Sequence, residues 1–414
     1  MAGRVRVVRI AVFVDRFPVL SETFVLNQIT GLIDRGHDVD IVPARPGGDA
    51  VVHGDVERYG LRSRVLPLCP PALVRLQRAP RLFSRLVRLR GLGALAAVDA
   101  FRHGRDAWSL RLLYAAAVFA DRGSYDVVLC HFGPNARFAQ RLRDVGALRG
   151  PLAAVFHGWD LSQFLRRSGP RPYARLFARG DLFLPISARW AERLRELGCP
   201  SERTVVHHMG IDPNRFPFET RDLGPDEPVR VLSVARLVEK KGIEFGIRAV
   251  AAYLATPGAR PLEYCIVGDG PLRADLARLI RDLRVSGHVT LVGHKSQEEV
   301  TRELQRAHVF VAPSVTGADG DEEGIPVVLM EALAVGLPVV STRHSGIPEL
   351  IEDGVSGVLV AEGDAEALAD ALARLVDNVG GWPAMAQRGR QRVEEDFNLH
   401  QLNDQLVSLM EGLC

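Results

Sequence analysis

Short apolar runs alternate along the chain with longer segments in which apolar residues recur every three or four positions. Residues 7–14 form one such run, and residues 21–35 follow it with apolar side chains along one helical face. A short continuous apolar run is typical of a strand buried on both sides, whereas the longer period is typical of an amphipathic helix. The pattern therefore predicts an α/β protein in which helices cover both faces of parallel sheets.

The predicted strands fall into two series. The first comprises residues 7–14, 39–42, 127–130, 153–156, 182–186 and 205–208, and the second comprises residues 231–235, 264–267, 289–292, 309–312, 338–341 and 357–360. A polar, proline-dense stretch separates them, so we place one domain at residues 1–210, a linker at 211–228 and a second domain at 229–396. Doubly wound sheets bind ligands at the carboxyl ends of their strands, which predicts a cleft between two facing domains.

Composition and charge limit the classes of protein to which the chain can belong. The 414 residues are 47% apolar and 25% charged, with a net charge of +2 that gives no argument for a nucleic-acid partner. Residues 1–200 nevertheless carry a net charge of +14 and residues 201–414 one of −12, so the first domain is expected to present a basic surface.

The cysteines and the N-terminal segment favour a cytoplasmic protein. The five scattered cysteines show no CxxC or Cys/His spacing, which argues against a disulfide scaffold and a zinc site. The first apolar run stops at Asp15, far short of a signal-peptide core or of the roughly 20 residues that cross a membrane.

The acidic segment 319–331 is the densest group of chemically active residues. Glu323 and Glu331 lie eight positions apart, and Pro326 between them suits the first turn of a helix that contains Glu331. Acidic residues at a helix start can simply cap it. The alternative is a ligand that carries both phosphate and hydroxyl groups, with the phosphate at the helix N-terminus and the hydroxyls on the carboxylates.

Two cations could meet such a phosphate. Arg236 follows a predicted strand, and Lys241 is expected to begin the next helix; lysine occurs only at positions 240, 241 and 295. Arginine binds phosphate through paired hydrogen bonds, and lysine acts as a movable point charge. A solvated charged loop is the alternative interpretation.

Two histidines, His131 and His157, end predicted buried strands, where α/β sites form. Each could satisfy a hydrogen bond in the core or take part in chemistry, and both interpretations stay open. Gly268-Asp-Gly270 lacks the third glycine of a dinucleotide fingerprint, so we expect only a tight turn there. No GxSxG segment supports hydrolase chemistry of that type.

Five arginines recur at helical spacing in residues 75–88. They are Arg75, Arg78, Arg81, Arg85 and Arg88, and leucine and phenylalanine residues lie between them. Pro80 interrupts the pattern, which allows two short helices in place of one. The stripe is either a solvated face over a packed apolar side or a surface that docks on anionic lipid.

Several motifs in a fixed order resemble the retaining family-4 glycosyltransferases of GT-B fold, especially bacterial exopolysaccharide transferases of the colanic-acid and amylovoran type. The resemblance covers nearly the whole chain. Its markers are Phe-Pro-Val-Leu-Ser-Glu-Thr-Phe at 17–24, His131-Phe-Gly, Phe-His157-Gly-Trp-Asp, Pro-Ile-Ser187, Gly-Ile-Asp-Pro at 210–213, Arg236 with Lys241-Gly, Val-Gly-Asp-Gly-Pro at 267–271, Glu323 with Glu331, and His-Ser-Gly-Ile-Pro-Glu at 344–349.

The resemblance implies a nucleotide-sugar donor, which is a substrate, and no metal or other cofactor. Arg236 and Lys241 would stabilise the leaving diphosphate, and Glu331 would hold the ribose hydroxyls. Glu323 would bind the donor sugar near its 3-hydroxyl, and His157 would approach its 6-hydroxyl. The expected catalytic residues are therefore His157, Glu323, Arg236 and Lys241. The remaining donor contacts would come from Gly293, His294 and Lys295 at the base and from Gly324, Ile325, Pro326 and Val327 at the helix start.

The resemblance also implies that the first domain faces the acceptor and that the C-terminal helix at 397–414 crosses back to it. The acceptor-side residues would be Ser21, Glu22, Thr23 and His131. We expect retaining transfer of a hexose, from a UDP-sugar rather than a GDP-sugar, to a glycan or lipid-linked saccharide in polysaccharide biosynthesis, by a cytoplasmic or peripheral membrane enzyme.

Three alternatives stay open on these residues. They are the same chemistry on a small natural-product acceptor, a GT-B nucleotide-sugar epimerase, and an inactive nucleotide-sugar sensor. Glu323 could also act as a covalent nucleophile. One departure from the family concerns the donor sugar: many members have Glu-Gly-Phe-Gly where this chain has Glu323-Gly-Ile-Pro326, so one backbone N–H is missing.

Overall fold

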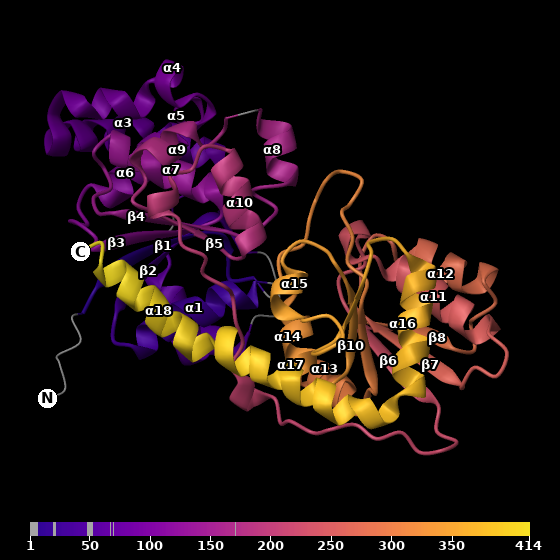
Figure 1. The fold of residues 1–414 in the computed structure, drawn as a ribbon. Coiled ribbons are helices and arrows are strands. Elements are labelled where there is room, and N and C mark those ends of the chain that lie inside the picture. The colour runs from indigo at the N-terminus through magenta and orange to yellow at the C-terminus, as the bar shows by residue number, and fades with distance from the viewer. Residues whose placement is uncertain (1–6, 20–21, 48–52, 67, 69, 170) are drawn as a thin grey trace, which may run out of the picture.

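Two parallel β-sheets, each covered by helices, make up the core of the protein (Figure 1). The computed structural model describes residues 7–19, 22–47, 53–66, 68, 70–169 and 171–414. The first sheet lies within residues 9–185 and the second within residues 229–360. The predicted fold class, two doubly wound parallel-sheet domains that face one another, is confirmed.

The first sheet has the strand order β2-β1-β3-β4-β5, and every pair is parallel. Its strands are β1 (Arg9–Phe17), β2 (Asp38–Pro46), β3 (Val127–His131), β4 (Leu152–Phe156) and β5 (Leu182–Pro185). Every residue of β3 and β4 is buried, as the continuous apolar runs predict. The strand order reverses between β1 and β3, so a crevice opens at the carboxyl ends of these two strands.

Helices follow the strands of this sheet. They are α1 (Thr23–Asp34), α7 (Gly133–Asp144), α8 (Gln163–Ser168), α9 (Ala174–Arg179) and α10 (Ala188–Glu196). The expected helix at 21–35 is therefore present as α1, which buries Ile29 and Leu32 against the sheet.

A run of helices connects β2 to β3 and lies at the outer end of this domain (Figure 1). It comprises α2 (Gly54–Arg58), η1 (Leu61–Arg64), α3 (Ala72–Arg90), η2 (Gly91–Val98), α4 (Ala100–His103), α5 (Arg105–Trp108) and α6 (Arg111–Phe119). The two short helices that Pro80 allowed are replaced by the single helix α3. Pro80 and Leu76 are both exposed, so water can bond the Leu76 carbonyl that lacks an N–H partner.

The second sheet has the order β11-β10-β9-β6-β7-β8, again with every pair parallel. Its strands are β6 (Val229–Val234), β7 (Leu262–Val267), β8 (Val289–Gly293), β9 (Val309–Ala312), β10 (Val339–Thr342) and β11 (Val358–Val360). This is the dinucleotide-fold strand order, and it reverses between β6 and β9. Its helices are η5 (Glu239–Lys241), α11 (Ile243–Ala255), α12 (Arg273–Asp282), α13 (Gln297–Arg306), α14 (Val327–Ala334), α15 (Ile347–Leu350) and α16 (Ala365–Asp377).

The end of the chain returns from the second domain to the first (Figure 1, yellow). The segment contains η6 (Val379–Gly381), α17 (Trp382–Asp396) and α18 (Leu399–Glu411). Leu406 and Met410 of α18 are buried within the core of the first domain. Asp404 also accepts a hydrogen bond from Arg35, with Nε and Oδ1 2.7 Å apart.

The strand predicted at residues 205–208 does not form. This segment is flanked by the single turns η3 (Ser201–Arg203) and η4 (Pro213–Arg215). It runs beside β5 with two backbone hydrogen bonds, Val205 N–H to Phe183 and His207 N–H to Pro185, each 2.9 Å. Val205 and Val206 remain exposed, because the segment lies at the sheet edge and only one bridge, at Thr204, pairs it with β5.

Candidate active site

A cavity of about 450 Å³ lies where the carboxyl ends of the two sheets face each other. Its first-domain wall consists of Glu22, Thr23, Phe24, Phe132, His157, Trp159, Ile186 and Met209. Its second-domain wall consists of Arg236, Lys240, Lys241, Asp321, Glu323, Gly324, Ile325, Pro326, Val327 and Val328. Both strand-order reversals open into this cavity, because Glu22 follows β1, Arg236 follows β6 and Glu323 follows β9.

Glu323 is the most strongly stabilised carboxylate of the second-domain wall. Burial by itself would raise its pKa, but the neighbouring Lys241 and Lys240 lower the pKa to about 2. Lys241 Nζ forms an ion pair with the Glu323 carboxylate, and Lys240 Nζ lies 3.0 Å from Asp321 Oδ2. Glu323 is therefore ionised at neutral pH.

The backbone of Glu323 is fixed from behind by a buried histidine. His344 Nε2 accepts the Glu323 N–H at 2.9 Å, and His344 Nδ1 lies 2.7 Å from Glu362 Oε1. Because Nε2 accepts a hydrogen bond, the ring proton lies on Nδ1, which donates a hydrogen bond to Glu362. From the sequence, His344 is recognised only as part of a family motif, and Glu362, which follows β11, is missed.

Arg236 and Lys241 both reach the cavity, but from a different local structure than expected. Lys241 ends the short turn η5, and α11 begins two residues later at Ile243. Arg236 has no ion pair or side-chain hydrogen bond with the described part of the chain. An unpaired guanidinium at the edge of a sheet is free to bind an anionic ligand.

The start of α14 also differs from the prediction. Pro326 occupies the N-cap position and Val327 is the first helical residue, so the proline precedes the first turn instead of beginning it. Gly324 lies close to the first domain, where an added Cβ would come 2.8 Å from Ile186 Cδ1. The helix N-terminus faces the cavity through Val327 and Val328.

Four of the predicted donor residues lie outside the lining of this cavity. Glu331 is buried inside α14, and Gln297 Nε2 donates to its Oε1 at 3.2 Å. Burial, partly offset by this hydrogen bond, raises the pKa of Glu331 to about 7. Gly293, His294 and Lys295 lie at the end of β8, and Lys295 forms an ion pair with Glu303. Gln297, which joins this segment to Glu331, was not singled out from the sequence.

The first-domain wall is built around two buried histidines. His131 Nδ1 and His157 Nε2 are 3.0 Å apart, so one ring donates to the other. Burial lowers the pKa of His131 to about 3, and burial together with His131 lowers that of His157 well below its usual value. Of the two, only His157 lines the cavity, and its ring contacts those of Phe24 and Phe132 at centroid distances of 4.8 and 4.5 Å.

Asp160 holds the turn that follows His157. Its carboxylate accepts the N–H groups of His157 at 3.0 Å and Gly133 at 2.8 Å, which ties the ends of β3 and β4 together. Burial raises the pKa of Asp160 to about 6 against the opposing effect of these N–H donors.

Of the predicted acceptor-side residues, Glu22 and Thr23 line the cavity and His131 lies behind His157. Burial, with a further contribution from Asp15, raises the pKa of Glu22 to about 7. Ser21 lies outside the described residues.

Comparison with known proteins identifies the family. Residues 217–392 match the family described as "Glycosyl transferases group 1", and residues 90–215 match "Glycosyltransferase Family 4". The amylovoran biosynthesis glycosyltransferase AmsK of Erwinia amylovora is 43% identical over 411 residues, which cover 98% of this chain and 100% of AmsK. WcaL of Salmonella typhimurium, whose name refers to colanic acid biosynthesis, is 42% identical, with 98% and 100% covered. The chain belongs to this family of bacterial glycosyltransferases.

The fold of this glycosyltransferase agrees with solved structures. The Anabaena protein Alr3699/HepE in complex with UDP superposes with a TM-score of 0.69 at 17% identity, over 98% of this chain and 100% of that one. At this identity the likeness concerns the GT-B fold alone. The family resemblance inferred from the ordered motifs is confirmed.

Metal-binding clusters and membrane-spanning helices are both absent from the described residues. In the described segments, no group of three His, Cys, Asp or Glu side chains is arranged to hold a metal ion. No described helix of this glycosyltransferase combines the length and apolar character that a membrane span requires.

Proposed function

We propose that the protein transfers a hexose from a nucleotide diphosphate sugar, preferably a UDP-sugar, to a hydroxyl of a glycan or lipid-linked saccharide in exopolysaccharide biosynthesis, with retention at the anomeric carbon. One observation carries the proposal. Arg236, Lys241 and Glu323 meet at the strand-order reversal of the second sheet, and Arg236 has no acidic partner within the described residues. Such a cation beside a helix N-terminus suits a diphosphate.

In this proposal the bond between sugar C1 and the diphosphate oxygen breaks, and both electrons leave with the diphosphate. Arg236 and Lys241 stabilise that developing charge, which is the largest expected contribution to catalysis. The acceptor hydroxyl oxygen bonds to C1 from the face that the diphosphate leaves, and its proton passes to the departing phosphate oxygen. The anomeric configuration is thereby retained without a metal ion.

The environment of Glu323 favours a binding role over a nucleophilic one. Its carboxylate is held by Lys241, and its pKa of about 2 reflects strong stabilisation of the charge. A carboxylate stabilised in this way is a weak nucleophile but a good acceptor for sugar hydroxyl groups. His157, kept neutral by burial, can exchange a hydrogen bond with the donor's 6-hydroxyl.

The test combines binding and product analysis. The full chain is screened by thermal shift against UDP-, GDP- and dTDP-glucose, because a ligand of the native state raises the melting temperature. Product formation with synthetic lipid-linked saccharides is then followed by NMR in excess EDTA. We expect retention and full activity. An inverted product, or activity that only added divalent metal restores, would refute the mechanism, and donor turnover without acceptor would identify an epimerase.

The proposal includes reversible docking on an anionic membrane surface through the α3–α5 region. Six large apolar side chains there are exposed: Leu73, Leu76, Leu89, Leu95, Phe101 and Trp108. Arg78, Arg81 and Arg88 are exposed among them. Three arginines of the stripe have intramolecular partners: Arg75 donates to the carbonyls of Pro70 and Ser109, Arg85 pairs with Asp121, and Arg88 Nη2 donates to Ser84 Oγ at 3.5 Å.

Apolar side chains that insert into lipid, surrounded by arginines, match the chemistry of an anionic bilayer interface. Each arginine near such a surface contributes about 1 kcal/mol, so binding should be reversible and sensitive to salt. Vesicle co-sedimentation with and without anionic lipid tests this. Changing Arg78, Arg81 and Arg88 to Gln, or Phe101 and Trp108 to Ser, should reduce pelleting, whereas changing Arg278, Arg281 and Arg284 of the second domain to Gln should not. Equal pelleting of all variants would refute docking.

A further inference from the structure

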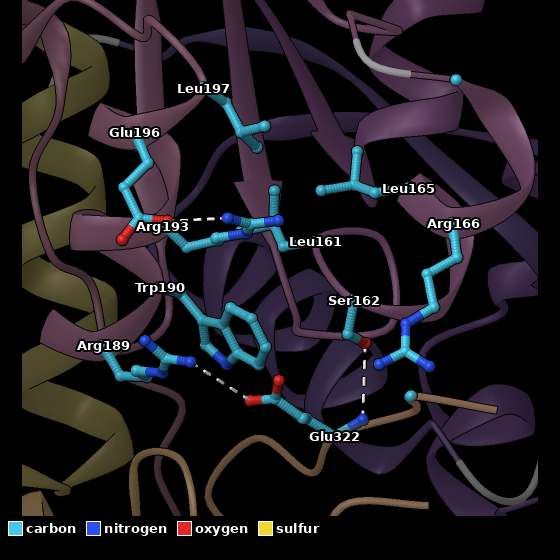
Figure 2. Close-up of a pocket in the computed structure, with 12 residues that line it drawn as sticks. Leu161, Ser162, Leu165, Arg166, Arg189, Trp190, Arg193, Glu196, Leu197 and Glu322 are labelled. Carbon is cyan, nitrogen blue, oxygen red and sulfur yellow. Dashed lines mark hydrogen bonds and ion pairs between the residues drawn. The ribbon is translucent and has the colours of Figure 1, made fainter. Parts of the chain in front are cut away.

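A second cavity, of about 560 Å³, lies next to the candidate active site on the other side of the loop 319–323. Its walls come from α8, α10 and that loop (Figure 2). Glu322, in its lining, immediately precedes Glu323 of the active site, and Ser162 lies three residues after Trp159. The Glu322 N–H donates to Ser162 Oγ at 3.4 Å, so the two segments that separate the cavities touch.

Three arginines give this second cavity an excess of positive charge. Arg193 pairs with Glu196 at 2.7 Å, and the Arg189 guanidinium lies 3.8 Å from the Glu322 carboxylate. Arg166 forms no ion pair or side-chain hydrogen bond with the described residues. Figure 2 shows Arg166 and Arg189 on opposite sides of the pocket, with Trp190 and Ser162 between them.

Arg166 is held in place by backbone rather than by an acidic partner. Its guanidinium lies against Gly320, where an added Cβ would come 2.0 Å from Arg166 Cζ. Gly320 also has φ of +76°, a conformation that other residues adopt with strain. The close contact orients Arg166 and leaves its N–H donors available to a ligand.

The rest of the lining is partly apolar. Leu161, Leu165 and Leu197 belong to it, and Leu161 and Leu165 are buried behind the arginines. Trp190 is 1% exposed, and its buried indole Nε1 has no hydrogen-bond partner among the described residues. This nitrogen lies against Gly158, where an added Cβ would come 3.2 Å from it.

We propose that this cavity is an acceptor subsite that binds an anionic substituent of the acceptor saccharide, a carboxylate or a phosphate, through Arg166 and Arg193. The inference rests on the proposed glycosyl transfer and specifies its acceptor. In the proposed function, Arg236 and Lys241 in the other cavity already bind the diphosphate of the donor. The paired N–H donors of a guanidinium group match the oxygen spacing of both carboxylates and phosphates. The loop 319–323 then separates the reacting hydroxyl from the anionic group.

The test measures binding of matched probes to the full chain saturated with UDP. Methyl glucuronide is compared with methyl glucoside, and glucose 6-phosphate with glucose, by saturation-transfer NMR titration. We expect at least one anionic probe to bind about tenfold more tightly than its neutral partner, as the gain of a charge-assisted hydrogen bond implies. The carboxylate and phosphate arms show which anion the site prefers.

Matched variants locate the effect. Arg166→Gln and Arg193→Gln should each remove most of the preference for the anionic probe. Arg167→Gln and Arg195→Gln, on the same two helices but outside the cavity lining, should retain it. Equal binding of charged and neutral probes, or a preference that survives both cavity variants, would overturn the subsite. Failure of UDP to bind in the first step would instead contradict the UDP preference of the proposed function.

Discussion

The two walls of the active-site cavity offset the free-energy cost of burying polar groups in opposite ways. On the second-domain wall the largely buried acidic and basic side chains form ion pairs, Lys241 with Glu323 and Lys240 with Asp321. On the first-domain wall the titratable groups are held toward their neutral forms: burial lowers the pKa of His157 and raises that of Glu22 to about 7. The rings of Phe24 and Phe132 contact His157.

The difference indicates which wall can stabilise the charge that develops in the proposed reaction. A paired charge keeps its ionised form in a buried site, whereas an isolated one loses it. Arg236 has no acidic partner in the part of the chain described, but it is exposed, so its charge is not buried. The neutral wall can face sugar rings and hydroxyl groups without adding further unpaired charge. Under the proposed function, the diphosphate would lie against the charged wall and the uncharged reactants against the other.

Removing the cations of the charged wall should have the largest effect. Arg236→Gln and Lys241→Gln should each lower kcat/KM by about 10²-fold or more, equivalent to roughly 3 kcal/mol of leaving-group stabilisation. The two variants should differ in stability, because only Lys241→Gln leaves a buried carboxylate without its partner. Steady-state kinetics and melting temperatures measure both effects. Near-wild-type turnover in both variants would contradict the assignment of these cations.

Glu331 allows a test of how pKa and stability are linked. Its folded-state pKa, about 7, lies above the ordinary value of 4.5, so the protein loses stability as pH rises between these two values. Glu331→Gln removes the free-energy cost of ionising this buried carboxyl group, and it keeps an oxygen that can accept a hydrogen bond from Gln297. Urea unfolding should show a gain for the variant that approaches about 3 kcal/mol above pH 7 and disappears below pH 4.5.

Glu323→Gln is the matched control for that measurement. Glu323 has a pKa of about 2, below its ordinary value, so its charge stabilises the fold at neutral pH and the stabilisation is lost as pH falls through 4.5 toward 2. Its replacement should destabilise the protein at pH 7. If both glutamine variants shift stability in the same direction at pH 8, the contrast between the two carboxyl groups is wrong.

The smallest effect is expected behind the charged wall. Glu362→Gln weakens the hydrogen bond that fixes His344, and through it the backbone of Glu323. Loss of one charge-assisted hydrogen bond predicts a decrease of about tenfold in kcat/KM. UDP binding, followed by calorimetry, should stay unchanged, since UDP lacks the sugar that Glu323 is proposed to hold. An equal loss of UDP affinity would show general disruption of the site.

The sequence predicts the fold well because its signals are local. The buried strands are continuous apolar runs, and residues that follow strands at a strand-order reversal, such as Arg236 and Glu323, must lie near the cleft. The strand at 205–208 fails because an apolar run does not reveal whether a neighbouring strand continues beside it.

The features missed from the sequence depend on contacts between distant segments. The pairs Lys240–Asp321, Gln297–Glu331 and His344–Glu362 join different loops and helices, and no spacing along the sequence predicts them. The exposure of Phe101 and Trp108 was missed for a related reason. Both belong to four-residue helices that are too short to show a periodic apolar face.

The return of α18 to the first domain has a consequence for synthesis. Leu406 and Met410 complete a core whose other members belong to residues 8–209. A ribosome adds about 5–20 residues per second, and N-terminal domains generally fold first as they emerge. The first domain therefore lacks these two core side chains until α18 has left the ribosomal tunnel. The domain made first completes its core only after the second sheet has been synthesised.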